Sequence, residues 1–214
     1  KINATLINYN TNNLAQFDGA FRHSKVTGLI DDTDTAITSN ITTVTLAHNL
    51  TPTLSTATAY TIQLNNAFYN PHSGHNSSSG GVLASTGFKV SGDTTNEHFL
   101  DDDGAGNIRR YILVAGVRQY QDSTAGPITY STGEIKISSI NIISVENVDE
   151  VASSAIRLTV TPDSLDIIPV RNQILKIDFV NTNINGSLDT IATGDSSSGT
   201  TATTTSTYVT PSSY

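Results

Sequence analysis

The chain contains no cysteine, methionine or tryptophan, and only 14% of its residues are charged. Without cysteine it can form neither a disulfide framework nor a zinc–thiolate site, and no thiol can act as a nucleophile. It has no apolar run of the length that a membrane-spanning helix needs. Because the chain begins at Lys1 without an initiator methionine, we expect it to be a piece of a longer protein.

What the chain does contain is typical of a β-rich protein. Its 214 residues suffice to bury a core, and 36% of them are hydrophobic. Serine, threonine and asparagine are abundant, and these residues favour strands, turns and caps over helix interiors. The 11 basic and 19 acidic residues give a net charge of −8, which argues against nucleic acid as a partner because phosphates would be repelled.

Helical periodicity is confined to the first forty residues. Leu14, Phe17 and Phe21 follow the spacing of one helical face, and Asn12 and Asn13 can cap its start. Gly19 interrupts this face, so the region is either one helix or two short helices that meet there. Gly28 and a group of aspartates are expected to end it, namely Asp31, Asp32 and Asp34.

After Asn40 the apolar residues recur at every second position, which predicts strands. The expected elements are an alternation over 42–46, a strand over 60–64, a loop over 69–81, an alternation over 82–90, a hairpin over 99–117, strands over 135–142 and 156–160, and a strand over 170–179. Three further features are expected between them: a break at Gly126-Pro127, a bulge at Ser138-Ser139 and a turn at Pro162-Asp163-Ser164. Residues 108–117 form the second strand of the hairpin and are expected to lie centrally in a sheet, because both faces are apolar from Tyr111 onward.

The sequence therefore predicts a mainly β fold with a short helical region (α+β), antiparallel sheets, two small domains and an extended tail. We expect a helical region plus strand over 1–52 that makes ring or dimer contacts, a β-rich domain over 53–125, a β domain over 126–186, and a Ser/Thr-rich tail over 187–214 that orders only against partners.

Residues 101–107, Asp-Asp-Asp-Gly-Ala-Gly-Asn, imitate the start of a calcium-binding loop. Such a loop needs an oxygen ligand at its fifth position and a bidentate glutamate at its twelfth, and these positions hold Ala105 and Ile112. We therefore favour a hairpin turn in which Asp and Asn bond to the backbone and the two glycines supply positive φ.

Two other clusters could in principle carry chemistry. His72 and His75 could approach one metal ion, but they lie in a Gly- and Ser-rich segment, and we expect a solvated loop. Glu146, Asp149 and Glu150 could supply paired carboxylates, but no tryptophan is available as a sugar platform, and we expect an acidic turn. We predict no catalytic, cofactor-binding or metal site.

Arg171 shares a face of the expected 170–179 strand with Leu175, Ile177 and Phe179. An arginine at the edge of an apolar face either pairs with a carboxylate, within the protein or across an interface, or is a plain surface residue. The candidate assembly contacts are Leu14, Phe17, Phe21, Arg22 and Arg171. The apolar stripe among them could be either core or contact, and core packing is the commoner use of such a stripe.

Three stretches carry a resemblance to a known family: 12–40, 99–107 and 161–175. In this order they resemble the C-terminal part of the large baseplate wedge subunit of contractile-tailed, T-even-type phages, a relative of the baseplate J proteins. The resemblance covers most of residues 12–178 and none of the tail. It rests on phrase-like motifs and not on catalytic signatures.

The resemblance implies a structural protein that is not an enzyme. In that family, copies pair and link neighbouring wedges into a ring around the central hub, and the ring changes shape when the tail sheath contracts. It implies as partners further copies of the chain and other wedge and hub proteins, with no nucleic acid, membrane, cofactor or small-molecule substrate. It also implies a virion location in the tail baseplate after assembly in the host cytoplasm.

Two other classes of function remain open from the residues alone. A phage fibre or surface adhesin that binds cell-envelope glycans would also be rich in Ser, Thr, Asn and β-strands. An envelope-degrading hydrolase would need Glu146, Asp149 and Glu150 to act as its carboxylates.

Overall fold

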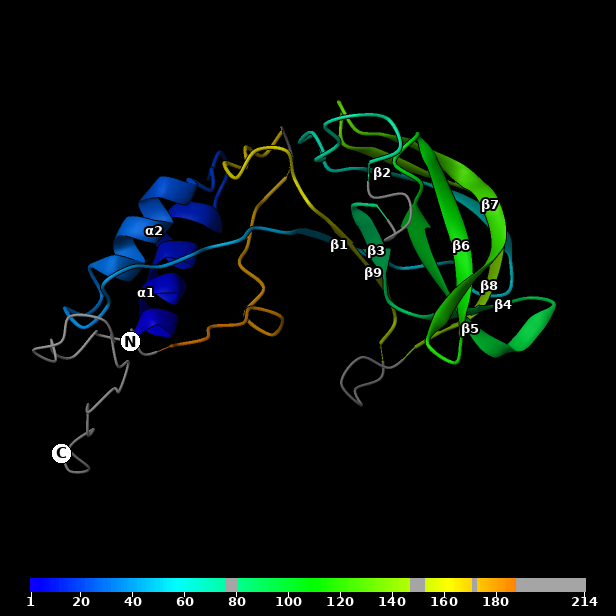
Figure 1. Cartoon of the computed structure of the whole chain (residues 1–214), viewed down its shortest axis with the longest axis horizontal. Coiled ribbons are helices and arrows are strands. Elements are labelled where there is room, and N and C mark those ends of the chain that lie inside the picture. Colours follow the sequence, from blue (N-terminus) through cyan, green and yellow to red (C-terminus); the bar gives the residue numbers. More distant parts are fainter. Residues whose placement is uncertain (76–80, 147–152, 171–172, 188–214) are drawn as a thin grey trace, which may run out of the picture. The chain divides into compact units, whose positions relative to one another are not determined.

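The computed structural model describes residues 1–75, 81–146, 153–170 and 173–187 (Figure 1). The chain forms two compact units, 1–177 and one that begins at Asp178. The elements are α1 Ile2–Tyr9, the π-helix η1 Asn10–Leu14, α2 His23–Asp31, β1 Leu46–Leu50, β2 Ala57–Gln63, β3 Leu83–Ser85, β4 Phe88–Val90, β5 Asp93–Asp102, β6 Asn107–Val114, β7 Val117–Thr129, β8 Glu134–Val145 and β9 Ile156–Val160. The predicted mainly β, α+β fold is confirmed. No helix in the described ranges is long and apolar enough to cross a membrane.

All strand pairs are antiparallel. The strands follow the order β1-β9-β3-β5-β4-β8-β7-β6, and β2 adds to β8. Because β5 also pairs with β6, the pairings run in a closed circuit from β5 through β4, β8, β7 and β6, and Figure 1 shows these strands curving around one another. The predicted division at 125/126 falls inside β7, so it does not coincide with the end of an element.

The sheet buries a core of aliphatic residues and two phenylalanines, to which strands inside and outside the circuit contribute. This main core consists of Leu50, Ile62, Phe68, Leu83, Phe88, Val90, Leu100, Ile108, Ala125, Ile128, Ile135, Ile137, Ile142, Ile156, Leu158 and Val160. The alternation predicted over 156–160 is confirmed, because Ile156, Leu158 and Val160 are all buried. The bulge expected at Ser138-Ser139 also occurs, as a register shift in the pairing of β2 with β8.

The predicted hairpin over 99–117 is two hairpins. Strand β5 continues through Asp102, and Asp103 to Gly106 make the first turn before β6. The second turn is Ala115-Gly116, both with positive φ, and it leads into β7. Strand β6 is central between β5 and β7, as predicted. At its end, the apolar residues Leu113 and Val114 are exposed.

Three strand predictions are wrong. Residues 42–45 precede β1 and are not in a strand. The alternation over 82–90 is divided into β3 and β4 at Thr86-Gly87, where Glu146 accepts a hydrogen bond from the Gly87 N–H. In the described residues 173–179 there is no strand, because Leu175 and Ile177 pack against the helices instead.

Gly126-Pro127 does not break the pattern but lies inside β7. The register of β6 with β7 shifts beside this dipeptide, and such an irregularity accommodates a proline that cannot donate to the ladder. A Cβ at Gly126 would collide with the backbone oxygen of Lys136. The glycine therefore allows β7 to pass close to β8.

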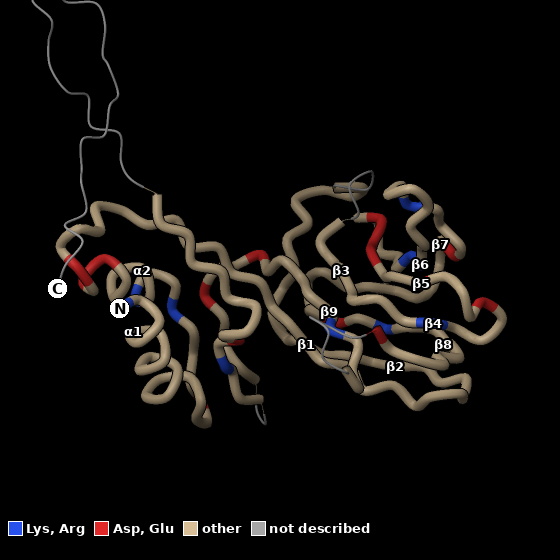
Figure 2. Tube along the Cα trace, turned by 90° about the horizontal axis from the view of Figure 1, so that it is seen from below, with Lys and Arg blue, Asp and Glu red and all other residues tan. Residues whose placement is uncertain are grey.

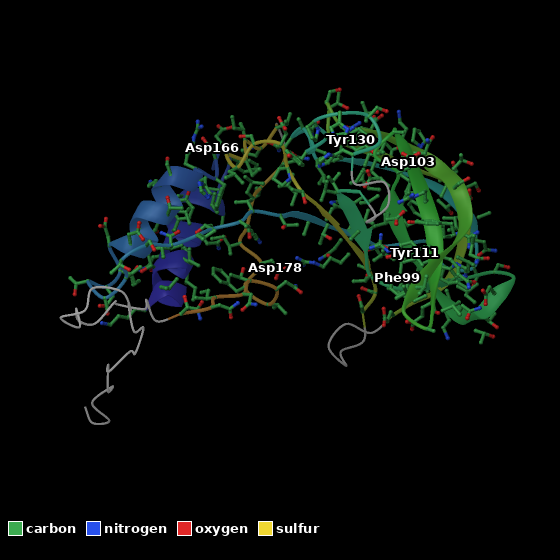
Figure 3. The ribbon with its side chains drawn as sticks, in the orientation of Figure 1. Phe99, Asp103, Tyr111, Tyr130, Asp166 and Asp178 are labelled. Carbon is green, nitrogen blue, oxygen red and sulfur yellow. The ribbon has the colours of Figure 1, made fainter. Side chains whose placement is uncertain are left out.

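The second unit is described only to Ser187. It opens with a turn in which the Asp178 carboxylate accepts hydrogen bonds from the N–H groups of Val180 and Asn181 and from the Asn181 side chain (Figure 3). The predicted tail over 187–214 lies, beyond its first residue, outside the described residues.

Candidate assembly interface

The helical region is a small cluster of its own, built from α1, η1 and α2. Its buried residues are Leu6, Tyr9, Leu14, Val26 and Ile30. The predicted face of Leu14, Phe17 and Phe21 is not helical, because no helix contains all three. Asn12 and Asn13 lie within η1 and so do not cap a helix start, and Gly28 lies within α2 and so does not end it.

Close packing of the backbone explains why the chain leaves the helix after Leu14. The N–H of Ala15 donates to the carbonyl of Asn10 at 2.8 Å, which widens the last turn to the π form. A Cβ at Gly19 would lie 2.5 Å from the Leu14 carbonyl oxygen and 2.6 Å from that of Asn13. Only glycine fits there, so the returning chain crosses directly over the end of η1.

The structure separates the candidate assembly contacts by exposure. Leu14 is buried and belongs to the helical core, whereas the side chain of Phe17 is 75% exposed. Phe21 is half-buried, and its ring meets that of Tyr9 edge-on with centroids 6.2 Å apart. Of the apolar three, Phe17 alone exposes most of its surface.

Arg22 is bound to a distant part of the same chain. Its Nη1 donates to Asp166 Oδ2 at 2.9 Å, and the N–H of His23 donates to Asp166 Oδ1 at 2.8 Å. Asp166 therefore supplies the N-terminal cap of α2 from outside the helix. The bonds from Arg22 and His23 lower the pKa of the Asp166 carboxyl. Arg171 lies outside the described residues.

Residues late in the chain complete the helical cluster. Phe21 and Ile167 exchange two backbone hydrogen bonds of 2.9 Å in an isolated antiparallel bridge. Leu175 and Ile177 pack on the buried residues, and the Ile177 N–H donates to Asn10 Oδ1 at 2.8 Å. The helices thus depend on a segment about 150 positions away, between Ile167 and Ile177.

One exposed apolar side chain stands out beside α2. Ile41 is 97% exposed, yet its neighbours on both sides are fixed. Asn40 Nδ2 donates to the Thr27 carbonyl at 3.0 Å and to Asp31 Oδ1 at 2.6 Å. The carbonyl of Thr42 lies 2.9 Å from His23 Nε2. We call Ile41 the Ile41 knob, because the contacts of Asn40 and Thr42 hold it along α2 between Thr27 and His23 with its side chain in solvent.

A second group of side chains lies on the outer face of β5, β6 and β7, where Leu113 and Tyr120 are exposed and Tyr111 is buried beneath its neighbours. Cross-strand pairing places Phe99 opposite Tyr111, Tyr111 opposite Tyr120, and Leu113 opposite Arg118. The rings of Phe99 and Tyr111 are stacked with centroids 5.6 Å apart, and Figure 3 shows them on neighbouring strands. The opposite face of β5 and β6 carries Leu100 and Ile108 of the main core, so this group faces away from the core.

A buried carboxylate lies under this group. Asp101 is 1% exposed and accepts hydrogen bonds from Arg109 Nε at 2.9 Å, Arg118 Nη1 at 3.1 Å and the Tyr120 hydroxyl at 2.9 Å. The guanidinium of Arg109 lies 4.2 Å from the centroid of the Tyr120 ring, and that of Arg118 lies 4.9 Å from that of Tyr111. The shared carboxylate holds both guanidiniums over the rings. We call Phe99, Arg109, Tyr111, Leu113, Arg118 and Tyr120 the arginine–tyrosine face.

Asp102, the next residue, points into the protein and fixes the β3 end of the sheet. It is fully buried and accepts hydrogen bonds from the N–H groups of Val82 and Leu83, both at 2.7 Å, and from Gly104 at 3.1 Å. The Tyr130 hydroxyl donates to it at 2.6 Å. Burial and this bond raise the pKa of Tyr130.

The side chains that the sequence offered as possible metal ligands or catalytic groups make contacts within the protein. Asp103 accepts hydrogen bonds from the N–H groups of Ala105 and Asn107, as predicted for a hairpin turn. His72 and His75 contact each other edge-on in a loop. Across the described ranges, no group of three His, Asp or Glu residues could hold a metal ion. Asp149 and Glu150 lie outside the described residues.

Sequence reasoning missed the Ile41 knob and the arginine–tyrosine face. The knob has no periodic signal, because its position depends on side-chain bonds from Asn40 to α2. The face is spread over three strands, and the only available signal was the alternation of aromatic and arginine residues along 109–120.

Comparison with protein families gives a match at the start of the chain. Residues 1–49 match the family model described as "Baseplate structural protein gp6, C-terminal domain III". The matched segment contains α1, η1, α2, the Ile41 knob and most of β1. A search of curated proteins found no match. The family match supports a structural protein of the phage tail baseplate and interaction with other baseplate components.

Proposed function

We propose that this chain is a structural subunit of the baseplate wedge in a contractile phage tail. It associates with further copies of itself and with other wedge and hub proteins, and it links neighbouring wedges into a ring around the hub. It performs no catalysis. The observation that carries this proposal is the agreement between the baseplate family match over 1–49 and the compact helical cluster.

The exposed apolar side chains of the helical cluster support a role in contacts with other proteins. Its core is small and needs Leu175 and Ile177 for completion, while Phe17, Ile7 and Ile41 remain exposed around it. Exposed large apolar side chains gathered on one small module are typical of protein interfaces. In this proposal Phe17 belongs to the contact surface, Leu14 and Phe21 support it from inside, and Arg22 holds the connection to Asp166.

Labelling intact phage particles with an antibody against residues 1–49 tests the proposal. We expect label at the tail baseplate in electron micrographs, repeated around the tail axis. Label on the fibres or the capsid would contradict it. Binding of the purified chain to bacterial envelopes, with no label at the baseplate, would favour the glycan-binding adhesin instead.

Self-association is tested separately by light scattering of the complete protein with its wedge partners at micromolar concentration. We expect a defined oligomer, and Phe17→Ser should weaken it while the far-ultraviolet circular dichroism stays unchanged. Leu54→Ser is the matched control, because Leu54 is a half-exposed apolar residue in the loop between β1 and β2. A persistently monomeric mixture would contradict self-association.

A further inference from the structure

We propose that the pair Asn185-Gly186 is a site of spontaneous covalent modification, at which the asparagine loses its side-chain amide and becomes aspartate or isoaspartate. The sequence contains no second Asn-Gly pair. The inference concerns the chemistry of the chain itself and does not depend on the proposed function.

The reaction is an attack of the backbone on the neighbouring side chain. The backbone nitrogen of Gly186 forms a bond to Asn185 Cγ, the bond between Cγ and Nδ2 breaks, and the proton of the attacking nitrogen leaves with the ammonia. The cyclic imide then takes up one water molecule. Water that attacks Cγ restores the ordinary peptide bond and leaves aspartate, whereas water that attacks the main-chain carbonyl carbon leaves isoaspartate.

The glycine makes the attack sterically easy. The nitrogen of Gly186 must approach Cγ in a near-attack geometry, and a residue without Cβ reaches unusual backbone conformations more readily than any other. Apart from its chain neighbours, no heavy atom of the described residues lies within 4 Å of the position that a Cβ would take on Gly186. The approach to the nitrogen is therefore open.

The fold does not hold the reacting atoms apart. Asn185 and Gly186 are exposed and belong to no helix or strand. The last turn before them is that of Asp178, whose backbone carbonyl accepts a hydrogen bond from the Thr182 hydroxyl at 2.6 Å. Within the described part of the chain, no hydrogen bond engages the Gly186 N–H or the Asn185 side chain. The backbone of this pair can therefore rotate into the reactive geometry.

Two Asp-Gly pairs could form the same imide, with loss of water in place of ammonia, but the fold restrains both. In Asp18-Gly19, the glycine is buried and its N–H donates to the Gln16 carbonyl at 3.3 Å. In Asp103-Gly104, the glycine is also buried and its N–H donates to Asp102 Oδ2 at 3.1 Å. A nitrogen held in this way cannot turn toward the neighbouring carboxyl group, so the fold leaves Asn185 as the reactive position.

Asn183 provides a matched comparison in the same segment. It is exposed and lies outside any helix or strand, as Asn185 does, but Ile184 follows it. A β-branched residue restricts its own backbone, and its side chain shields the nitrogen. The two asparagines therefore differ chiefly in the residue that follows them.

The modification places a carboxylate in an uncharged stretch. Residues 179–187 hold no charged side chain and are drawn in tan in Figure 2. Because both products ionise at neutral pH, the modified chain is one unit more negative than the −8 of the unmodified chain. Isoaspartate also lengthens the main chain by one carbon atom. The modified chain should therefore separate from the unmodified chain by anion exchange.

The test is peptide mapping of the whole folded chain by mass spectrometry during incubation at mildly alkaline pH. The peptide that follows Lys176 carries Asn183 and Asn185 together, so fragmentation compares them in one molecule. We expect Asn185 to gain one mass unit at least about tenfold faster than Asn183, because a backbone that rarely reaches the near-attack geometry reacts correspondingly more slowly. Isoaspartate should form at Asn185, since direct hydrolysis of the amide would give aspartate alone.

Exchanging the following residues tests the cause. Gly186→Ile should slow the conversion of Asn185 to the rate of Asn183, and Ile184→Gly should raise the rate at Asn183 to that of Asn185. Both positions are exposed and outside the helices and strands, so the circular dichroism should stay unchanged. Equal rates at the two asparagines of the wild type, or aspartate without isoaspartate, would overturn the inference.

The protection of the two Asp-Gly pairs is tested in the same samples. While Asn185 is converted in the folded chain, Asp18 and Asp103 should form no isoaspartate, and in urea both should form it. If either aspartate isomerised as fast in the folded chain as in urea, the selection of Asn185 by the fold would be refuted.

Discussion

The guanidinium of Arg22 lies 2.9 Å from the carboxylate of Asp166, and the same carboxylate receives the N–H of His23, the first residue of α2. This one side chain therefore joins the late segment of the chain to the start of a helix. It also lies beside the isolated bridge between Phe21 and Ile167, which are the chain neighbours of Arg22 and Asp166. The segment that carries Asp166 is thus a structural part of the helical region.

Replacement of Asp166 should loosen α2. Asp166→Ala removes both the cap and the ion pair, whereas Asp166→Asn keeps an acceptor for the His23 N–H and loses the charge. We expect hydrogen exchange of the α2 amides to accelerate in the order wild type, Asn, Ala. Asp163→Ala, at an exposed position three residues earlier, should leave the exchange unchanged. Equal exchange in Asp166→Ala and wild type would show that the cap is dispensable.

The same carboxylate predicts a pH effect. Its pKa is lowered in the folded protein, so its contribution to stability is present above the unfolded pKa near 4 and is lost as the pH falls through the lower folded value. The wild type should therefore lose α2 protection on acidification below pH 4 more steeply than Asp166→Asn. Hydrogen exchange between pH 3 and pH 5 measures the difference, and parallel profiles would contradict it.

Replacement of Asp102 should destabilise the fold more than replacement of Tyr130, which donates a hydrogen bond to it. Asn keeps one acceptor oxygen, which can receive the N–H groups of Val82 and Leu83, but its amide nitrogen cannot accept the hydrogen bonds that Asp102 Oδ2 receives from Gly104 and Tyr130. We expect Asp102→Asn to lower the free energy of unfolding by on the order of 3 kcal/mol, and Tyr130→Phe by about 1 kcal/mol. Urea unfolding followed by tyrosine fluorescence provides the measurement. A smaller loss in Asp102→Asn than in Tyr130→Phe would refute the role of the carboxylate.

Alanine substitutions at two glycines should separate the cost of close packing from the cost of backbone strain. At Gly126 a Cβ would collide with the backbone of Lys136, whereas at Gly116, whose φ is 78°, a Cβ would meet open space. Gly116→Ala should cost about 1 kcal/mol, the price of a left-handed conformation. Gly126→Ala must also displace a strand and should cost at least about 2 kcal/mol. Similar unfolding midpoints for the two variants would contradict this distinction.

His98 predicts a second pH dependence of stability, which comes from a base and not from an acid. It is buried, and its Nδ1 accepts a hydrogen bond from Arg110 at 2.9 Å. Burial, and next the positive charge of Arg110, lower the pKa of His98 below its ordinary value of 6.5. A base with a lowered folded pKa takes up more protons when unfolded, so stability falls as the pH drops through the unfolded value. Asp93, 3.3 Å from Nε2, opposes this shift. His98→Gln should flatten the stability profile between pH 7 and pH 5 in thermal unfolding, and an unchanged slope would contradict the assignment.

Much of the β region could be predicted because its signals are local. The alternation along β8 and β9, the bulge at Ser138-Ser139 and the Asp103 turn all depend on residues a few positions apart. The helical region was predicted in the right place but with the wrong internal boundaries. Gly19 prevents one helix only because the chain returns over Leu14, and that contact has no sequence periodicity.

The candidate assembly contacts illustrate the same limit. Leu14 and Phe17 are both apolar and three positions apart, and periodicity treats them alike. Their burial differs because η1 ends between them, so that one side chain enters the cluster and the other is exposed. The strand predicted over 170–179 was wrong for a related reason, since Leu175 and Ile177 are covered by helices and have no neighbouring strand to pair with.

The sequence by itself determined the fold class, the acidic character, the absence of thiol chemistry and the position of the main hairpin turn, because composition and nearest-neighbour preferences suffice for these. The tertiary structure decided which apolar residues are core and which are exposed. It also brought Asp166 to α2, Leu175 to the helical core, and Arg109, Arg118 and Tyr120 to Asp101. These arrangements join residues that are far apart in the chain or lie on different strands, and only the packed fold sets their distances.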